Sequence, residues 1–276
     1  MSSKSPISVI VVTRNRPHQL IECLKSLKKN TCQSFELIIV DQSTDPHHCS
    51  NKHQLISFLK KFPHSIYLKQ NKKGKSKGLN LAIKHSHAAI LAFTDDDCIL
   101  DKNWLTNILK TFEKHPHITA VFGKTLPYQP HLHPRQTCPC TFSYADDKSH
   151  LIAQPVKHWE RIGFGNNMAW QKNFFDKYGL FKEWLGPGSF GSNAEDAEIS
   201  LRALRNKEKI FYNPQVVTYH NKWLTKEELA KQFQSYKQGE LFCYGYFALK
   251  GERIGRLVIK DNLNKYLSRF RLFKKI

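Results

Sequence analysis

The sequence predicts an α/β fold: a mostly parallel sheet flanked by helices, followed by a less regular half and a C-terminal basic helix. Short apolar runs rich in β-branched residues alternate with segments whose apolar residues recur at helical spacing. Polar clusters directly follow several of these runs. The 276 residues, 40% of them hydrophobic, are enough to bury a core and exclude a disordered or fibrous protein.

The first strand–helix–strand unit is expected at the N-terminus. Residues 7–12 are an unbroken apolar run, which is typical of a strand buried in a parallel sheet. Pro17 suits the first turn of a helix, whose apolar face comprises Leu20, Ile21, Leu24 and Leu27. Residues 35–40 form the second apolar run, and the helical stripe after it contains Leu55, Ile56 and Leu59. This order implies right-handed crossovers and a parallel sheet.

The same alternation continues through residue 122. A short strand is expected at residues 66–68, a helix that carries Leu79, Ala82 and Ile83 follows, and residues 88–93 form the fourth strand. Residues 118–122 form the fifth strand, after an amphipathic helix with Trp104, Leu105, Ile108, Leu109 and Phe112. The N-terminal half is therefore predicted to be a doubly wound, Rossmann-like unit.

Polar side chains follow three of the expected strands, at the sheet edge where open parallel sheets bind ligands. The clusters are Thr13, Asn15 and Arg16; Asp41, Gln42 and Ser43; and Asp95, Asp96 and Asp97. Adjacent carboxylates raise one another's pKa, so a cation or hydrogen-bond donors must neutralise the three aspartates. Carboxylate oxygens suit Mg²⁺ or Mn²⁺ bound together with substrate phosphates. The alternative is a solvated acidic turn that caps the helix beginning near Asn103.

An ordered set of motifs connects these clusters. It comprises Ile-Val-Val-Thr-x-Asn-Arg at residues 10–16, Ile-Val-Asp at 39–41, Gly74-x-Ser76-x-Gly78-x-Asn80 and Asp-Asp-Asp at 95–97. It continues with Gly165-Asn166-Asn167-Met168, Glu195-Asp196 and a single His220. Over residues 7–223 the set resembles glycosyltransferase family 2, whose members are inverting enzymes of the GT-A fold.

The resemblance implies roles for individual residues of the donor site. Thr13 and Asp41 would contact the nucleotide base, and Asp95 or Asp96 the ribose. Asp97 would bind the metal, Mn²⁺ or Mg²⁺, that bridges the donor diphosphate, and His220 matches a position that can complete the metal shell. Asn15, Arg16 and Asn80 are also expected to bind the donor.

The residue expected to contact the pyrophosphate differs from the family pattern. Many members carry an Arg directly before the Asn of the Gly-x-Ser-x-Gly-x-Asn motif, where this chain has Leu79. The contact is therefore expected to fall to Lys75 or Lys77. The resemblance favours a uridine diphosphate sugar as the donor, and it leaves the donor sugar and the acceptor open.

Glu195 and Asp196 supply a candidate catalytic carboxylate pair. They begin a helical pattern directly after the Gly-rich stretch 186–191, which is a candidate mobile acceptor loop. In a displacement from a diphosphate, a carboxylate on the opposite face removes the proton of the acceptor hydroxyl. We expect Asp196 to be this base and Glu195 to assist it. The alternative is an acidic first turn that the helix dipole favours.

The chain divides into three predicted segments. Residues 1–125 form the nucleotide-sugar-binding half, and residues 126–224 the acceptor half of the same GT-A domain, entered through a Pro-rich connection at residues 125–160. Residues 225–276 are a helical extension, in which residues 250–276 combine basic residues with an apolar stripe. Such a helix is typical of a membrane-surface element, and equally of a helix packed on the domain with a solvated basic face.

The net charge and the cysteine content limit which partners and which cellular location are expected. The net charge of +20 favours a polyanionic neighbour such as nucleic acid, an anionic lipid surface or a phosphorylated ligand. A nucleic-acid-binding protein and another nucleotide-using transferase remain as alternatives, although no recognition motif supports the first, and we expect no nucleic acid partner. Seven cysteines without a leader-like N-terminus favour a reducing cytosol, with possible peripheral attachment to the inner face of the membrane. His131, His133, Cys138 and Cys140 match no common zinc pattern.

Overall fold

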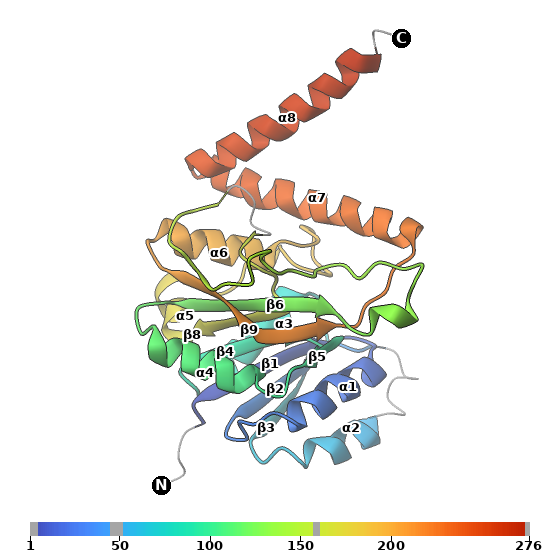
Figure 1. Ribbon diagram of the computed structural model, residues 1–276, viewed down its shortest axis with the longest axis vertical. Coiled ribbons are helices and arrows are strands. Elements are labelled where there is room, and N and C mark those ends of the chain that lie inside the picture. The colour runs from blue at the N-terminus through green and yellow to red at the C-terminus, as the bar shows by residue number, and fades with distance from the viewer. Residues whose placement is uncertain (1–4, 45–51, 157–160, 274–276) are drawn as a thin grey trace.

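The computed structural model describes residues 5–44, 52–156 and 161–273, and it shows one sheet covered by helices on both faces (Figure 1). Within these residues the sheet has nine strands, in the order β3-β2-β1-β4-β8-β6-β9-β5, and β7 also pairs with β9. The predicted α/β fold with a mostly parallel N-terminal sheet is confirmed.

The parallel part of the sheet follows the predicted strands closely. β1 (Ile7–Thr13) pairs in parallel with β2 (Glu36–Asp41) and β4 (Ile90–Asp95), and β2 pairs in parallel with β3 (Ser65–Lys69). The connecting helices are α1 (Pro17–Lys28), α2 (Lys52–Leu59) and α3 (Lys75–His85). The carboxyl ends of β1 and β4 therefore meet at one edge, where Val12 pairs with Asp95.

The helices form two layers because alternate residues of each strand face opposite sides of the sheet. Val9 and Val11 pack in one core cluster with α1, α2 and α4 (Trp104–Lys114). Ile10 packs in the other with α3, α5 (Lys172–Tyr178) and α6 (Glu195–Arg205). Ile56, which we assigned to the apolar stripe of α2, is instead 40% exposed, because the buried positions of this short helix are Leu55 and Leu59.

The C-terminal half enters the same sheet. β8 (Asn167–Gln171) lies between β4 and β6 (Ala120–Pro127), antiparallel to both, so the predicted fifth strand does not neighbour the fourth. β9 (Ile210–His220) runs parallel to β6 and pairs antiparallel with β5 (Cys98–Leu100) and β7 (His150–Ile152). The connection that we expected to begin at residue 125 begins after β6, and it contains the short helix η2 (Pro130–Leu132).

Two long helices complete the chain, α7 (Lys226–Leu249) and α8 (Arg253–Phe273), which meet at a sharp bend (Figure 1). A capping box between Thr225 and Glu228 begins α7. α7 covers α6 through a third core cluster, in which Val258 of α8 also takes part. No helix of the described chain is long and apolar enough to cross a membrane.

Candidate active site

A cavity of about 970 Å³ opens at the carboxyl ends of β1 and β4. Its walls include most of the residues that the sequence singled out, namely Thr13, Arg16, Lys75, Asp95, Asp96, Asp97, Glu195, Asp196 and His220. These residues come from β1, α3, β4, α6, β9 and the adjoining loops. The fold therefore brings both ends of the motif set into one site.

Basic side chains of the chain itself neutralise the three aspartates. One Arg16 guanidinium nitrogen lies 3.2 Å from Asp96 Oδ1 and 2.9 Å from Asp97 Oδ2. Lys75 Nζ lies 2.5 Å from Asp95 Oδ1 and 3.4 Å from a Glu195 oxygen. Arg16 and Lys75 are therefore among the neutralising groups that the three adjacent carboxylates require, so the acidic triplet by itself does not demand a metal.

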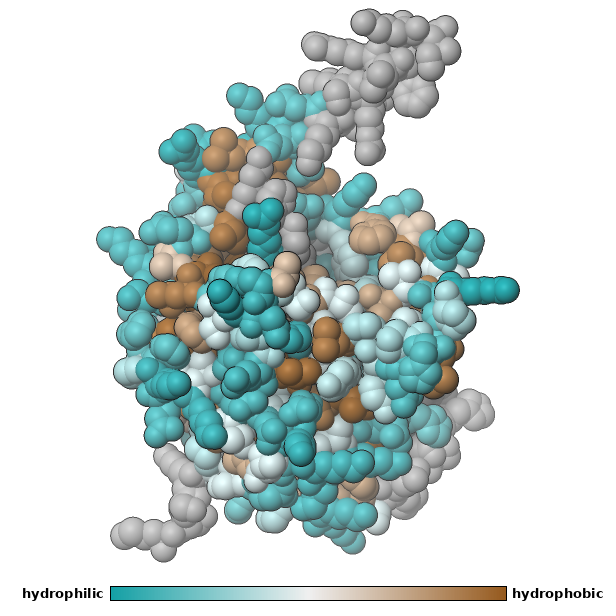
Figure 2. Space-filling model, in the orientation of Figure 1, coloured by the Kyte–Doolittle hydropathy of each residue, from teal (hydrophilic) through white to brown (hydrophobic). Residues whose placement is uncertain are grey.

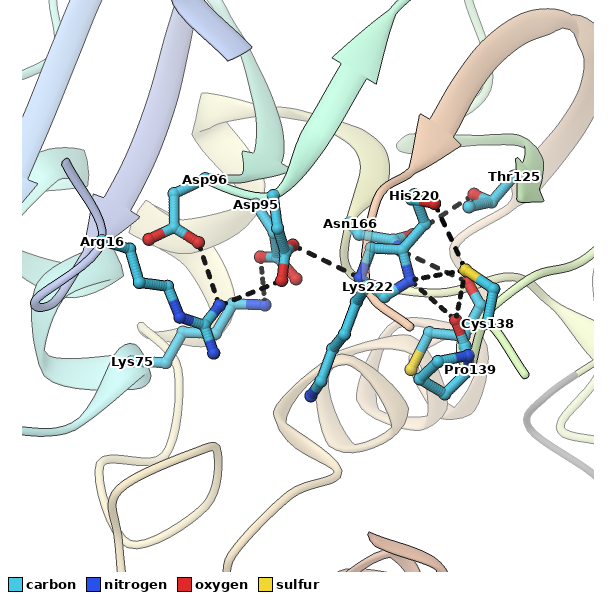
Figure 3. Close-up of polar contacts among 12 residues, drawn as sticks. Arg16, Lys75, Asp95, Asp96, Thr125, Cys138, Pro139, Asn166, His220 and Lys222 are labelled. Atoms are coloured by element: carbon cyan, nitrogen blue, oxygen red, sulfur yellow. Dashed lines mark hydrogen bonds and ion pairs between the residues drawn. The ribbon is translucent and has the colours of Figure 1, made fainter. Parts of the chain in front are cut away.

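Figure 3 shows the asymmetry of this cluster: Arg16 and Lys75 approach the aspartates from one side, and His220 lies on the other. Burial and the neighbouring charge of Asp97 raise the pKa of Asp96 to about 6. Burial alone would also raise the pKa of Asp97, but the hydrogen bond and charge of His220 hold it at about 2. Asp97 is thus ionised more readily than Asp96.

Asp97 and His220 form a pair that fits a divalent cation. Asp97 Oδ1 is buried, and it lies 3.3 Å from its charged partner His220 Nε2. His220 Nδ1 lies 2.7 Å from the carbonyl oxygen of Pro139, a contact that keeps the proton on Nδ1. Burial lowers the pKa of His220, but the hydrogen bond and charge of Asp97 raise it to about 10. The ring therefore carries a proton on Nε2 as well, which a cation would displace on binding.

The pair is not a complete metal site by itself. No group of three or more His, Cys, Asp or Glu side chains able to hold a metal occurs in the described part of the chain. Mg²⁺ and Mn²⁺ commonly bind through one or two protein ligands together with substrate phosphates and water. The residues present therefore fit a cation that arrives with a phosphorylated ligand.

The candidate base is held firmly at the start of α6. Asp196 Oδ2 accepts a 2.7 Å hydrogen bond from the backbone N–H of Gly165, and Oδ1 accepts one of 2.9 Å from that of Ala197. Burial raises the pKa of Asp196, with the charge of Lys75 opposing the shift. Burial also raises the pKa of Glu195 to about 7, again against the charge of Lys75. Both carboxyl groups accept protons more readily than ordinary ones.

The Gly-rich stretch before this pair is tied to α3. The backbone N–H of Lys75 donates to the carbonyl oxygen of Pro187 at 2.9 Å, and Ser76 Oγ donates to that of Leu185 at 2.7 Å. Gly186 has a φ of +93°, and a Cβ there would lie only 2.8 Å from Ser76 Oγ. Glycine is therefore required where this loop crosses the start of α3.

Four predicted donor-binding residues lie outside the cavity walls and support its loops. Asp41 accepts hydrogen bonds from the Ser43 backbone and the Tyr67 hydroxyl. Asn15, with a φ of +56°, accepts from the Thr44 backbone. Asn80 exchanges two 2.9 Å hydrogen bonds with the Phe181 backbone, which anchors the segment after α5. Lys77 also lies outside the walls, which leaves Lys75 as the candidate that reaches the site.

Sequence reasoning missed Lys222, whose side chain lines the cavity beside the Asp97–His220 pair (Figure 3). Its Nζ donates a 3.2 Å hydrogen bond to Gln232 of α7, and its charge lowers the pKa of Asp97. The sequence signal that could have pointed to Lys222 is its position two residues after His220. Cys138 also lines the site, with its Sγ 3.7 Å from His220 Nδ1.

Comparison with known proteins identifies the family. Residues 8–179 match the model of the family described as "Glycosyl transferase family 2". The chain belongs to glycosyl transferase family 2. This confirms the resemblance that the ordered motifs indicated.

Relatives of this family 2 chain include an uncharacterized glycosyltransferase of Haemophilus influenzae, 27% identical over 203 residues. The match covers 72% of this chain and 62% of that protein. Another relative is the glucosyl-dolichyl phosphate glucuronosyltransferase of Haloferax volcanii, 21% identical over 263 residues, which are 84% of this chain and 75% of that protein.

Solved structures share the fold of this family 2 chain. The Pyrobaculum calidifontis mannosyltransferase PcManGT, in complex with GDP-Man and Mn²⁺, matches with a TM-score of 0.67 and 18% identity, over 90% of this chain and 65% of that one. S. aureus TarS 1–349, in complex with UDP-GlcNAc, matches with a TM-score of 0.63 and 18% identity, over 86% of this chain and 65% of that one. The predicted GT-A fold is confirmed.

Proposed function

We propose that this chain is an inverting glycosyltransferase, which moves a sugar from a nucleotide diphosphate sugar to a hydroxyl of a glycan or lipid-linked acceptor. One observation carries the proposal: the buried carboxylate of Asp196 and the Asp97–His220 pair line the same cavity. In an inverting transfer the attacking hydroxyl loses a proton, which a carboxylate can accept, while the leaving diphosphate gains negative charge, which a cation can stabilise.

The diphosphate end of the donor has a defined place in this scheme. Asp97 and His220 would hold Mn²⁺ or Mg²⁺, which acts as a Lewis acid toward the leaving phosphate. Arg16 and Lys222 supply further positive charge beside that pair and stabilise the departing diphosphate. Lys75 also lines this cavity, and its ion pairs hold Asp95 and Glu195 in position.

The proton moves on the other side of the reacting carbon. Asp196 takes the proton of the acceptor hydroxyl, and the backbone N–H groups of Gly165 and Ala197 fix the direction of its carboxylate. The raised pKa of Asp196 makes it a better proton acceptor than an ordinary aspartate near neutral pH. Glu195 positions this end of the site through Lys75.

Two relatives guide the choice of donor. TarS was solved with UDP-GlcNAc and PcManGT with GDP-Man, so the shared fold accepts either nucleotide. We propose a uridine diphosphate sugar, as the family resemblance suggests. Thr13, whose hydroxyl donates a 2.7 Å hydrogen bond to Asp96, and the backbone of the loop after β1 supply the surface for the nucleoside.

We further propose that α8 attaches the chain to the surface of an anionic membrane, on the cytoplasmic side. Its exposed residues at a spacing of three or four are Arg253, Arg256, Leu257, Lys260 and Leu263, which mix positive charge with apolar side chains. Figure 2 shows hydrophobic residues gathered where α7 meets α8, among hydrophilic ones. Val258 and Ile254 instead pack toward α7, so only part of the predicted apolar stripe is free for lipid.

A thermal-shift screen with UDP-GlcNAc, UDP-glucose, UDP-glucuronic acid and GDP-mannose tests the proposed activity, each with Mn²⁺ and with chelator. A ligand at 100 times its Kd stabilises the native state by about 2.7 kcal/mol, which raises the Tm by roughly 5 °C. We expect such a shift with a uridine diphosphate sugar and Mn²⁺. The absence of a shift with all four sugars would reject the proposal.

A further inference from the structure

One face of α7 forms a wall of the cavity. Besides Ser235, the α7 residues that line it are spaced by three or four positions, as one helix face requires: Leu229, Gln232, Phe233, Tyr236, Lys237 and Glu240. We propose that this face is the acceptor-binding site, and that Phe233 stacks against the sugar ring that receives the transferred residue. This inference rests on the proposed glycosyltransferase function.

The position of α7 relative to the candidate base supports this assignment. Asn193, two residues before Glu195, donates a 2.6 Å hydrogen bond to Ser235 of α7. The Tyr236 hydroxyl lies 3.0 Å from Cys140 Sγ in the opposite loop of the cavity. The α7 face therefore borders the space in front of Asp196, where an attacking hydroxyl must arrive.

Close packing also fixes the position of α7 relative to α6 and the candidate base. A Cβ at Gly239 would lie 2.9 Å from the Asn193 backbone, so only glycine allows α7 to approach the loop before α6 this closely. Cys243, Tyr244 and Phe247 of α7 pack against Ala197 and Leu201 of α6, the helix that begins with Glu195 and Asp196. The acceptor wall and the base therefore belong to one packed unit.

The chemistry of the face suits a sugar. Phe233 is 53% exposed although it lines a cavity, whereas the large apolar residues of the core are buried. An aromatic ring offers a flat apolar surface to the C–H face of a sugar, and neighbouring amide, ammonium and carboxylate groups bond to its hydroxyls. Gln232, Lys237 and Glu240 supply these three groups. A bare lipid chain would instead call for a continuous apolar lining.

The test uses the full chain, the nucleotide sugar that gives the largest thermal shift, and four p-nitrophenyl glycosides as acceptors: glucoside, mannoside, N-acetylglucosaminide and glucuronide. We expect transfer to at least one of them. Phe233→Ala should raise the KM for that acceptor roughly fivefold or more, since truncating a central aromatic contact commonly costs over 1 kcal/mol. Phe233→Trp should keep the wild-type KM, and the KM for the donor should change less than twofold.

Leu241→Ala is the matched control, because Leu241 is an exposed apolar residue of α7, 46% exposed, outside the cavity walls. It should leave both KM values unchanged. An unchanged acceptor KM in Phe233→Ala, or transfer to polyprenyl phosphate but to none of the glycosides, would overturn the inference. If the wild-type chain releases no UDP from any donor, even to water, the proposed function itself fails, so the two failures are distinguishable.

Discussion

Asp196→Asn is the most informative single change, because it removes proton acceptance and keeps the shape of the side chain. Asp196 accepts two backbone hydrogen bonds, from Gly165 and from Ala197. The Asn amide offers only one oxygen, so one buried N–H loses its acceptor, at a cost of about 1–3 kcal/mol. Removal of a buried charge, whose burial raises the pKa of Asp196, offsets part of this cost. The variant should therefore stay folded, since domains are typically stable by about 5–15 kcal/mol.

The expected loss is in the chemical step. Removing a general base slows turnover by roughly 10²- to 10⁴-fold, which corresponds to about 3–5 kcal/mol of activation free energy. UDP release from the donor measures turnover, and titration calorimetry with UDP and Mn²⁺ measures donor affinity. We expect kcat to fall by that factor while the Kd for UDP stays within about twofold.

The pH profile adds a second test of the same residue. The base acts when it is deprotonated, so kcat/KM of the wild-type chain should fall as the pH is lowered through the pKa of Asp196. Because burial raises that pKa above the ordinary value of 3.8, the acidic limb should lie above pH 3.8. The Asn variant should lack this limb.

Glu198→Gln is the matched control, because Glu198 is a buried carboxylate of the same helix, paired with Arg202 at 2.8 Å and outside the cavity walls. It should change stability and leave kcat unaffected. Normal turnover in Asp196→Asn would refute the assignment of the base. A product that retains the anomeric configuration of the donor would refute the single inverting displacement.

Three other changes test the cation, the diphosphate contact and the membrane helix. Asp97→Asn should abolish the dependence of UDP affinity on Mn²⁺, since it removes the buried carboxylate that faces His220. Equal UDP affinity of the wild type in Mn²⁺ and in chelator would contradict the metal site. Lys222→Met should weaken UDP binding roughly tenfold, as loss of a charge-assisted contact does. Lys77→Met is the control, because Lys77 lies outside the cavity walls, and it should leave UDP binding unchanged. A loss of UDP affinity in Lys77→Met but not in Lys222→Met would instead identify Lys77 as the phosphate ligand. The membrane helix is tested by charge reversal of Arg253, Arg256 and Lys260 in α8. This variant should no longer co-sediment with anionic vesicles, because each basic residue contributes about 1 kcal/mol near such a surface. The control reverses three exposed lysines at the C-terminal end of α1, namely Lys25, Lys28 and the C-cap Lys29, and it should have no effect. Equal loss in both variants would show binding by general charge.

The sequence alone determined the parallel half of the sheet and singled out nine of the residues that line the cavity. Strands such as residues 7–12 are recognisable because a buried parallel strand is apolar throughout, and each strand end carries its polar cluster. Asp97, Asp196 and His220 were found because their order along the chain matches a family. These signals are local or sequential, and a single sequence contains them in full.

Only the tertiary structure decided what surrounds those residues. Thr13 and Asp96 are separated by 83 positions, and Cys138 and His220 by 82, so no local pattern predicts that they touch. The same holds for Arg16, which neutralises Asp96 and Asp97, and for β8, which enters the sheet between β4 and β6. α7 gives no clear amphipathic signal, because one face packs on α6 while another lines the cavity with polar and aromatic residues. Burial, pairing and exposure at these positions depend on contacts between distant parts of the chain. The hydrophobic periodicity of the sequence, in contrast, reflects only how residues are arranged within one helix or strand.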